Sequence, residues 1–173
     1  MTAADRTPRE PFGIDVAAEL VLWGARREVH EFHAGPGTFA SAVESITGRP
    51  VVTPVTRSNL HVLAELPRLL RVHGASRWTL DLRPPDRGPW PRLAVAVPYA
   101  LHAASCGCAL DLAVALRGAP ACLLGPYRNL GEPVSGSSFA PVCTSCAWRD
   151  ECHGVDARYL DRFGDAELRP QRD

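Results

Sequence analysis

Segments that favour strands alternate with segments that favour helices along most of this 173-residue chain, and no other feature constrains its fold as much. Four segments have the short, apolar, turn-bounded pattern of buried strands: residues 16–23, 50–56, 77–82 and 109–116. Three intervening segments have the pattern of helices: residues 38–46, 58–74 and 93–106. Strands joined by helices form right-handed βαβ units. The sequence therefore predicts an α/β fold with about four parallel strands.

Local signals predict where two of these helices begin. Thr38 is the expected N-cap of the first helix, which follows a loop at residues 28–37. Ser58 and Asn59 are expected to cap the second helix, which ends at Gly74. Five leucines of that second helix share one face: Leu60, Leu63, Leu66, Leu69 and Leu70.

The character of the chain changes after Tyr127. Residues 128–141 are rich in Gly, Ser and Pro and show no periodicity, and the segment from Cys143 onward is first Cys-rich and then charged. Such a tail buries too little apolar surface to fold by itself, so it needs a cross-link, which its cysteines can supply. We therefore divide the chain into a disordered lead-in (1–13), an α/β unit (14–127) and a Cys-rich C-terminal cap (128–173).

Charge and composition narrow the class of protein. Nineteen acidic residues cancel nineteen basic ones, which are all Arg, so we expect binding neither to nucleic acid nor to an anionic membrane surface. The N-terminus has no apolar signal sequence, and apolar runs of about 7–10 residues are too short to cross a bilayer. We expect a cytoplasmic protein with reduced thiols, in which six cysteines indicate metal or redox chemistry.

Three of these cysteines lie close together, in the pattern Cys143-x2-Cys146-x5-Cys152. The first two can turn toward one metal within a tight loop, and the third can join them. Cys122 is the best candidate for a fourth ligand, because it follows a predicted parallel strand and loops converge at strand ends. Four thiolates suit a [4Fe–4S] cluster or structural zinc, and zinc also accepts three thiolates and an imidazole. Unligated, buried thiols are the remaining interpretation.

The tail resembles the auxiliary-cluster segment, of the SPASM/twitch kind, at the C-terminus of many radical S-adenosylmethionine (radical SAM) enzymes. Such segments join a Cys-x2-Cys-x5-Cys core to an upstream cysteine in a Pro-x-Cys loop, here Pro120-Ala121-Cys122; Gly154-Val155-Asp156 and Tyr159 are similar as well. Asp156 stands where fuller patterns have a further cysteine, so one cluster at most is implied. The resemblance implies a [4Fe–4S] cluster held by Cys122, Cys143, Cys146 and Cys152.

Residues 33–46 and 51–75 resemble the later βα units of the radical SAM partial barrel. The strand end Thr56-Arg57-Ser58-Asn59 matches one that often faces the cofactor, which implies a cofactor-binding role for Asn59. The resemblance therefore implies that residues 14–127 form a partial (β/α) barrel, with the Cys-rich tail as its cap.

The hallmark of that family, an N-terminal Cys-x3-Cys-x2-Cys loop, does not occur in these 173 residues. We therefore expect that this chain alone does not use S-adenosylmethionine. A partial barrel leaves an unpaired sheet edge, which either a second chain or residues 12–16 together with the tail would cover. Of these, we expect a protein partner or a homodimer. A gene model truncated at its 5′ end would instead make the chain a fragment of an active enzyme.

Two functional hypotheses follow. The favoured one is an iron–sulfur protein whose single cluster relays electrons, or which presents substrate to or supports a catalytic partner. The alternative is an interaction scaffold that zinc or bare thiols hold together. Other candidate groups, each with an ordinary structural explanation, are His30 with His33, His102 with Cys106 and Cys108, and Asp81 with Arg83.

Overall fold

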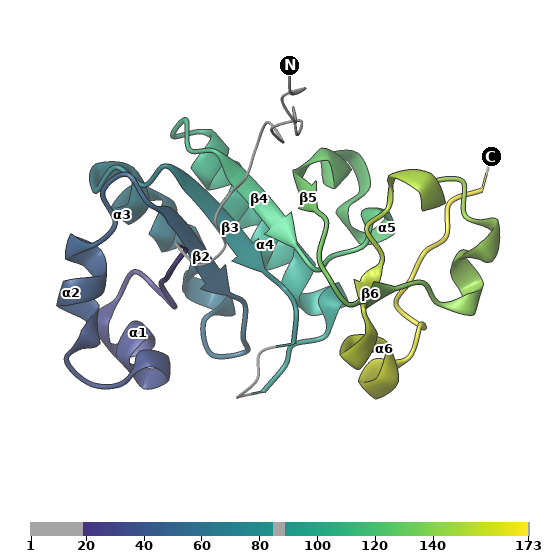
Figure 1. Cartoon of the computed structure of the whole chain (residues 1–173), viewed down its shortest axis with the longest axis horizontal. Helices are drawn as coiled ribbons and strands as arrows, with labels where there is room; N and C mark the ends of the chain where they lie inside the picture. Colours follow the sequence, from purple (N-terminus) through teal and green to yellow (C-terminus); the bar gives the residue numbers. More distant parts are fainter. Residues whose placement is uncertain (1–18, 85–88, 173) are drawn as a thin grey trace, which may run out of the picture.

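The computed structural model describes residues 19–84 and 89–172 (Figure 1). The predicted lead-in at residues 1–13 lies outside this part of the chain. One parallel sheet contains five strands in chain order: β1 (Leu20–Val21), β2 (Pro50–Pro54), β3 (Arg77–Asp81), β4 (Val114–Arg117) and β5 (Gly131–Glu132). In the tail, β6 (Ser137–Ser138) pairs antiparallel with β7 (Val155–Asp156). The predicted α/β fold with a parallel sheet is confirmed.

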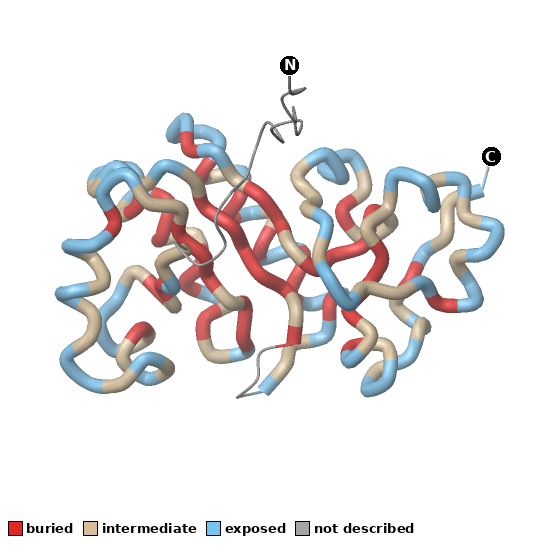
Figure 2. Tube along the Cα trace, viewed as in Figure 1, coloured by how far each residue is buried: buried red, intermediate tan, exposed pale blue. Residues whose placement is uncertain are grey.

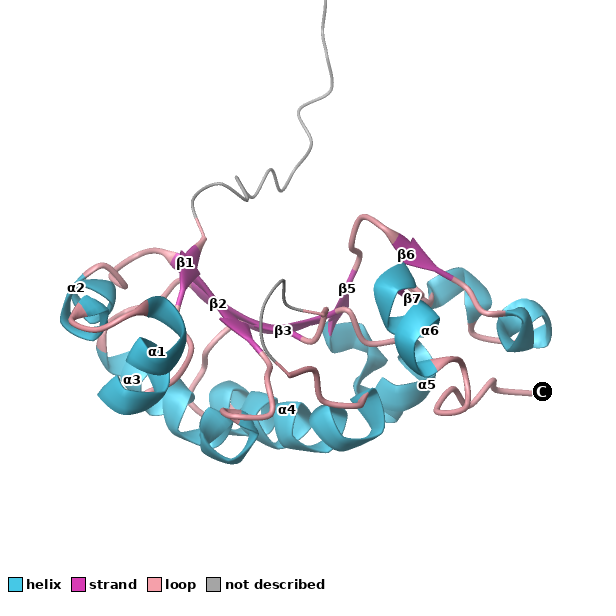
Figure 3. Cartoon of the chain, turned by 90° about the horizontal axis from the view of Figure 1, so that it is seen from below, coloured by secondary structure: helices cyan, strands magenta, loops and turns pink. Residues whose placement is uncertain are grey.

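Helices connect the strands and cover one face of the large sheet. The α-helices are α1 (Arg27–Ala34), α2 (Thr38–Glu44), α3 (Leu66–Val72), α4 (Leu93–Cys108), α5 (Ala121–Leu124) and α6 (Ala157–Phe163). The 3-10 helices are η2 (Leu60–Glu65), η3 (Gly125–Leu130), η4 (Pro141–Ser145) and η5 (Arg149–Glu151). In Figure 3, α3, α4 and α5 lie beneath the sheet, and no described helix lies over its opposite face. Within the described residues, no helix has the length and apolar character needed to cross a membrane.

The core lies between the sheet and α4, and buried positions follow β2, β3, β4 and the inner side of α4 in Figure 2. Trp78 of β3 is fully buried. It packs against Gly107 of α4, where a Cβ atom would lie only 2.8 Å from Cγ2 of Val114. Glycine is therefore required for helix and strand to approach so closely. Because side chains alternate along a strand, Leu80 and Leu116 face the helices together with Trp78 and Val114.

The prediction of a loop at residues 28–37 is wrong, because most of this segment forms α1. Its buried position is His30, whose Nδ1 accepts a hydrogen bond from the backbone N–H of Trp23 at 3.3 Å. A polar side chain at the buried position hides the apolar periodicity on which the prediction depends. Thr38 is the first residue of α2 and not its N-cap; Gly37 occupies the cap position with φ 77°, and Thr38 Oγ1 donates to Gly35 O.

The second predicted helix is divided into η2 and α3. Pro67 lies at the start of α3 and has no N–H for a helical hydrogen bond, which explains the break. Asn59 stands at the N-cap position of η2 but its side chain does not cap the helix. The predicted last strand begins at Val114 and not at 109, because α4 continues through Cys108 and a turn follows it.

The sheet also extends past the predicted boundary after residue 127. Residues 131–132 form β5, which pairs with the end of β4. A strand of two residues in a Gly- and Pro-containing connection has no pattern from which it could be predicted. The segment after Tyr127 therefore supplies one edge of the sheet.

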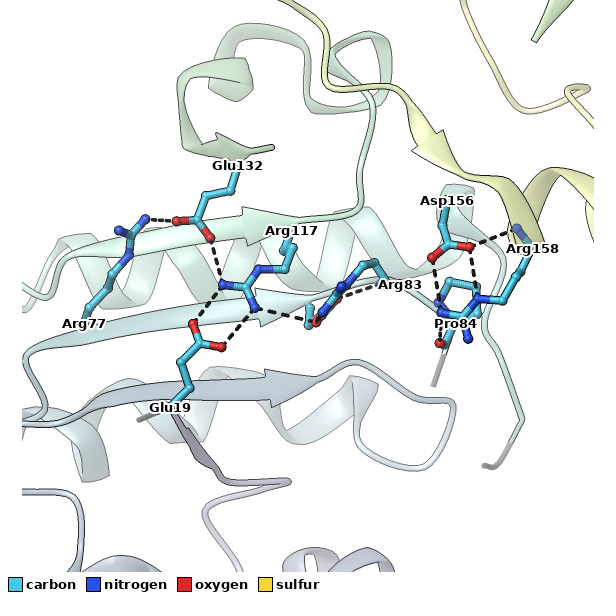
Figure 4. Close-up of polar contacts among 9 residues, drawn as sticks. Glu19, Arg77, Arg83, Pro84, Arg117, Glu132, Asp156 and Arg158 are labelled. Atoms are coloured by element: carbon cyan, nitrogen blue, oxygen red, sulfur yellow. Dashed lines mark hydrogen bonds and ion pairs between the residues drawn. The ribbon is translucent and has the colours of Figure 1, made fainter. Parts of the chain in front are cut away.

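The face of the sheet opposite the helices carries a network of charged side chains (Figure 4). Arg117 is its centre: the two terminal nitrogens donate to the Glu19 carboxylate at 2.8 and 3.1 Å, and Nη2 donates to Glu132 at 3.4 Å. Asp81 lies 4.0 Å from Arg117 and binds Arg83. The side chains of Arg117 and its three acidic partners are each less than one-fifth exposed. This face is therefore polar and charge-paired, not a second apolar core.

Replacing Arg117 with methionine should lower the free energy of unfolding by about 3–5 kcal/mol, because the shielded Glu19 carboxylate loses the cation that it pairs with. Glu132 and Asp81 would keep their ion pairs with Arg77 and Arg83. Urea denaturation of the two proteins measures the loss. The matched control is Arg26→Met, which breaks an ion pair with Glu65 that is exposed to solvent. A loss in R117M no larger than that in R26M would show that the network does not stabilise the fold.

The buried hydrogen bond from Trp78 Nε1 to Thr53 Oγ1, 2.9 Å long, gives a second prediction. Thr53→Val keeps the side-chain shape but leaves the indole N–H unpaired, so it should cost about 1–3 kcal/mol. In a Trp78→Phe background the same change should cost much less, since the donor is gone. A double-mutant cycle with denaturant unfolding measures this coupling, and additive losses would contradict the assignment.

Candidate metal centre

Four cysteines from two separate segments line one cavity: Cys122, Cys143, Cys146 and Cys152. Cys122 lies in α5, which begins four residues after β4 ends. Cys143 lies in η4, Cys146 follows η4, and Cys152 follows η5. All four are free thiols and partly buried. The structure therefore brings together all four cysteines that the sequence predicts as metal ligands.

Backbone N–H groups point at the sulfur atoms of three of these cysteines. Ala121 and Gly154 each donate to Cys152 Sγ at 3.4 Å. Arg169 donates to Cys122 Sγ at 3.5 Å, and Gln171 donates to Cys146 Sγ at 3.4 Å. A neutral thiol is a weak acceptor, whereas a thiolate gains from such donors. This arrangement therefore suits sulfur atoms that carry negative charge.

The remaining walls of the cavity are largely apolar. Besides Arg149, the lining includes two aromatic side chains, one aliphatic side chain and two prolines. These apolar residues are Phe139, Trp148, Val155, Pro120 and Pro170. Burial raises the pKa of the Cys122 and Cys143 thiols, so without a metal both stay protonated at neutral pH. A metal that binds here would have to displace those protons.

Arginines hold the loop around the cavity in place. Arg149 donates from Nη1 to the carbonyl of Cys143 at 3.3 Å, and its guanidinium lies 4.4 Å from the centre of the Phe139 ring. Arg128 lies 4.8 Å from the Trp148 ring and pairs with Glu151. These contacts connect the cysteine loop to η3 and to Phe139, which precedes the loop in the sequence.

The cysteine loop ends in a tight turn that only glycine permits. Gly154 has φ 75°, and a Cβ atom there would lie 2.7 Å from the carbonyl oxygen of Ser138 on β6. Asp156 then caps α6 by accepting from the N–H of Arg158 at 2.9 Å. The turn and the cap direct the chain away from the cavity and into α6.

Tyr159 of α6 fixes the tail to the main unit. Its hydroxyl accepts a hydrogen bond from the N–H of Leu93, the first residue of α4, at 2.7 Å, and donates to Glu167. The side chain is almost fully buried, and burial raises the pKa of its hydroxyl. The tail is therefore anchored on the same helix that packs beneath the sheet.

A complete single-ion site is not formed by the described residues: no three His, Cys, Asp or Glu side chains among residues 19–84 and 89–172 are grouped as ligands of one ion. The cysteines instead share a cavity with apolar walls. The chemistry that the four thiols have in common is soft, anionic coordination, which suits zinc or iron–sulfur clusters.

Asn59, predicted to contact a cofactor, is fully buried. Its Oδ1 accepts from the N–H of Thr56 at 2.8 Å, and its Nδ2 donates to the carbonyls of Trp23 and Pro54 at 2.9 and 2.8 Å. These three bonds join the ends of β1 and β2. Asn59 therefore stabilises the fold at this position, and its proposed contact with a cofactor stays a prediction.

The other candidate groups contact protein atoms. His33 stacks on Trp23 at 4.3 Å between ring centres, and its Nε2 lies 2.7 Å from Ser58 Oγ; burial lowers its pKa and that of His30. Asp81, which is buried, and Arg83 form an ion pair at the carboxyl end of β3. On α4, His102 and Cys108 are exposed and Cys106 is partly buried.

The N–H donors from residues 169 and 171 are the part of the site that sequence reasoning misses. They belong to the last described segment of the chain, 17 positions or more beyond Cys152. Every residue except proline has a backbone N–H, so no residue type in the sequence identifies these donors.

Comparison with known proteins finds no match: no protein-family model, no curated protein and no solved structure matches this sequence. No family is shown for the chain by these comparisons. Its functional interpretation therefore rests on the geometry of the cysteine cavity and on the motifs of its own sequence.

Proposed function

We propose that this chain binds one [4Fe–4S] cluster through Cys122, Cys143, Cys146 and Cys152 and acts as an electron-relay or supporting subunit of a redox enzyme. One observation carries the proposal: four thiols from two segments, far apart in the sequence, line a single cavity. The backbone N–H groups directed at their sulfur atoms support it further. The motif resemblance of the tail to auxiliary-cluster segments favours iron–sulfur over zinc.

Each part of the site would contribute to this role. A bound cluster would supply one-electron chemistry at this position. The four thiolates would hold it at every corner, which leaves no coordination position open for S-adenosylmethionine. The N–H donors would stabilise the negative sulfur atoms, and Phe139, Trp148 and Val155 would limit the access of water.

We further propose that the main unit is a partial (β/α) barrel that a second chain completes. In support, the strands follow chain order, the helices cover one face, and the opposite face is polar. Val21 of the edge strand β1 is 44% exposed. Such an edge offers hydrogen-bonding groups to a partner or to a second copy. A monomeric mass in light scattering at micromolar concentration would contradict the homodimer.

Anaerobic reconstitution with iron and sulfide should give a brown protein with about four iron atoms per chain, whose visible absorption is bleached by dithionite. Cys122→Ala should lose most of this colour and iron, because one corner of the cluster then lacks its thiolate. Cys108→Ser is the matched control, since Cys108 is an exposed thiol outside the cavity lining, and it should keep both.

Two other results would each replace the proposed iron–sulfur function with a different one. Colourless protein that retains one zinc ion per chain, and loses it in C122A, would show a zinc-stapled scaffold. Colourless protein that binds neither metal would leave four unligated thiols and an interaction scaffold. Iron content equal in C122A and C108S would show that the cluster, if bound, does not use Cys122.

A further inference from the structure

Residues 168–171, near the end of the described chain, form a strap beside the cysteine cavity. Leu168 is buried and its N–H donates to the carbonyl of Asp165 at 2.9 Å, which fixes the start of the strap. Its far end is held by the N–H of Ala147, which donates to the carbonyl of Gln171 at 2.9 Å. Pro170, between these anchors, lines the cavity. The strap is therefore fastened to the cysteine loop at one end and to the segment after α6 at the other.

The strap donates hydrogen bonds to two different cysteines. The N–H of Arg169 lies 3.5 Å from Cys122 Sγ, and that of Gln171 lies 3.4 Å from Cys146 Sγ. Residues two apart in an extended chain direct their backbone groups to the same side. Pro170, which has no N–H, stands between the two donors and adds an apolar ring to the cavity wall. The sequence Arg-Pro-Gln thus supplies two donors and a water-excluding group.

We infer that residues 168–171 set the reduction potential and the water exposure of the centre, with the N–H of Gln171 as a positioning donor. The inference rests on the proposed cluster. Hydrogen bonds to cysteine sulfur stabilise the more negative, reduced state and so raise the reduction potential. The strap also covers part of the cavity, which slows the entry of oxygen and water. A segment that merely tied down the tail would affect stability but not the potential.

Gln171→Pro tests the donor directly, because proline removes this one N–H. Gln171→Ala is the matched control: it keeps the N–H but removes the side chain, whose Nε2 donates to the carbonyl of Arg169 at 2.8 Å. After anaerobic reconstitution, a redox titration should give Q171P a more negative potential than both wild type and Q171A. Q171P should also bleach several-fold faster in air, with an unchanged iron content.

A second measurement does not depend on the cluster. In metal-free protein, the rate at which iodoacetamide alkylates Cys146, followed by mass spectrometry, should fall several-fold in Q171P, because the reactive thiolate loses its N–H donor, and should stay near the wild-type rate in Q171A. A variant ending at Leu168 also removes the cover of the cavity, so exposure should raise the rates at both Cys122 and Cys146; this variant tests the shielding if the proline variant fails to fold.

The outcomes separate this inference from the proposed function. Brown wild-type protein with equal potentials in Q171P and Q171A would overturn the role of the strap while the cluster stands. Colourless wild-type protein would refute the cluster and with it the effect on the potential. Equal alkylation rates in all variants would overturn the influence of the strap on the cysteines in either case.

Discussion

The convergence of three backbone segments on one cavity is the constraint on which the rest of this molecule depends. Cys122 arrives from the end of β4, the other cysteines from the loop before β7, and the strap from beyond α6. These segments meet because Tyr159 fixes α6 to the start of α4 and because β5 continues the sheet past β4. The geometry of the cysteine site is thus a product of the whole C-terminal half.

The two faces of the sheet are stabilised in different ways. Beneath it, Trp78 and its neighbours pack so closely against α4 that only glycine fits at position 107. On the other face, Arg117 holds three carboxylates in a paired and partly shielded network. Parallel sheets are usually covered on both faces, whereas no described helix lies over this face of the sheet. The proposed pairing with a second chain would account for this asymmetry.

Much of the fold could be predicted from sequence, and the failures have physical reasons. The positions of β2, β3 and α4 follow from apolar periodicity. α1 was missed because His30 takes the buried place that an apolar residue would mark, and β5 because two residues carry no pattern. For the site, the spacing of Cys143, Cys146 and Cys152 identified one loop, and the rule that strand ends gather functional loops selected Cys122.

The sequence by itself determined the alternation of strands and helices and the four cysteines, because periodicity and spacing depend only on residue types and their order. Only the tertiary structure decided how these parts meet. The pairing of Arg117 with Glu19 joins residues 98 positions apart, and the donors from Arg169 and Gln171 are backbone groups that every residue except proline possesses. Contacts of this kind depend on where the folded chain passes through space, which no local pattern records.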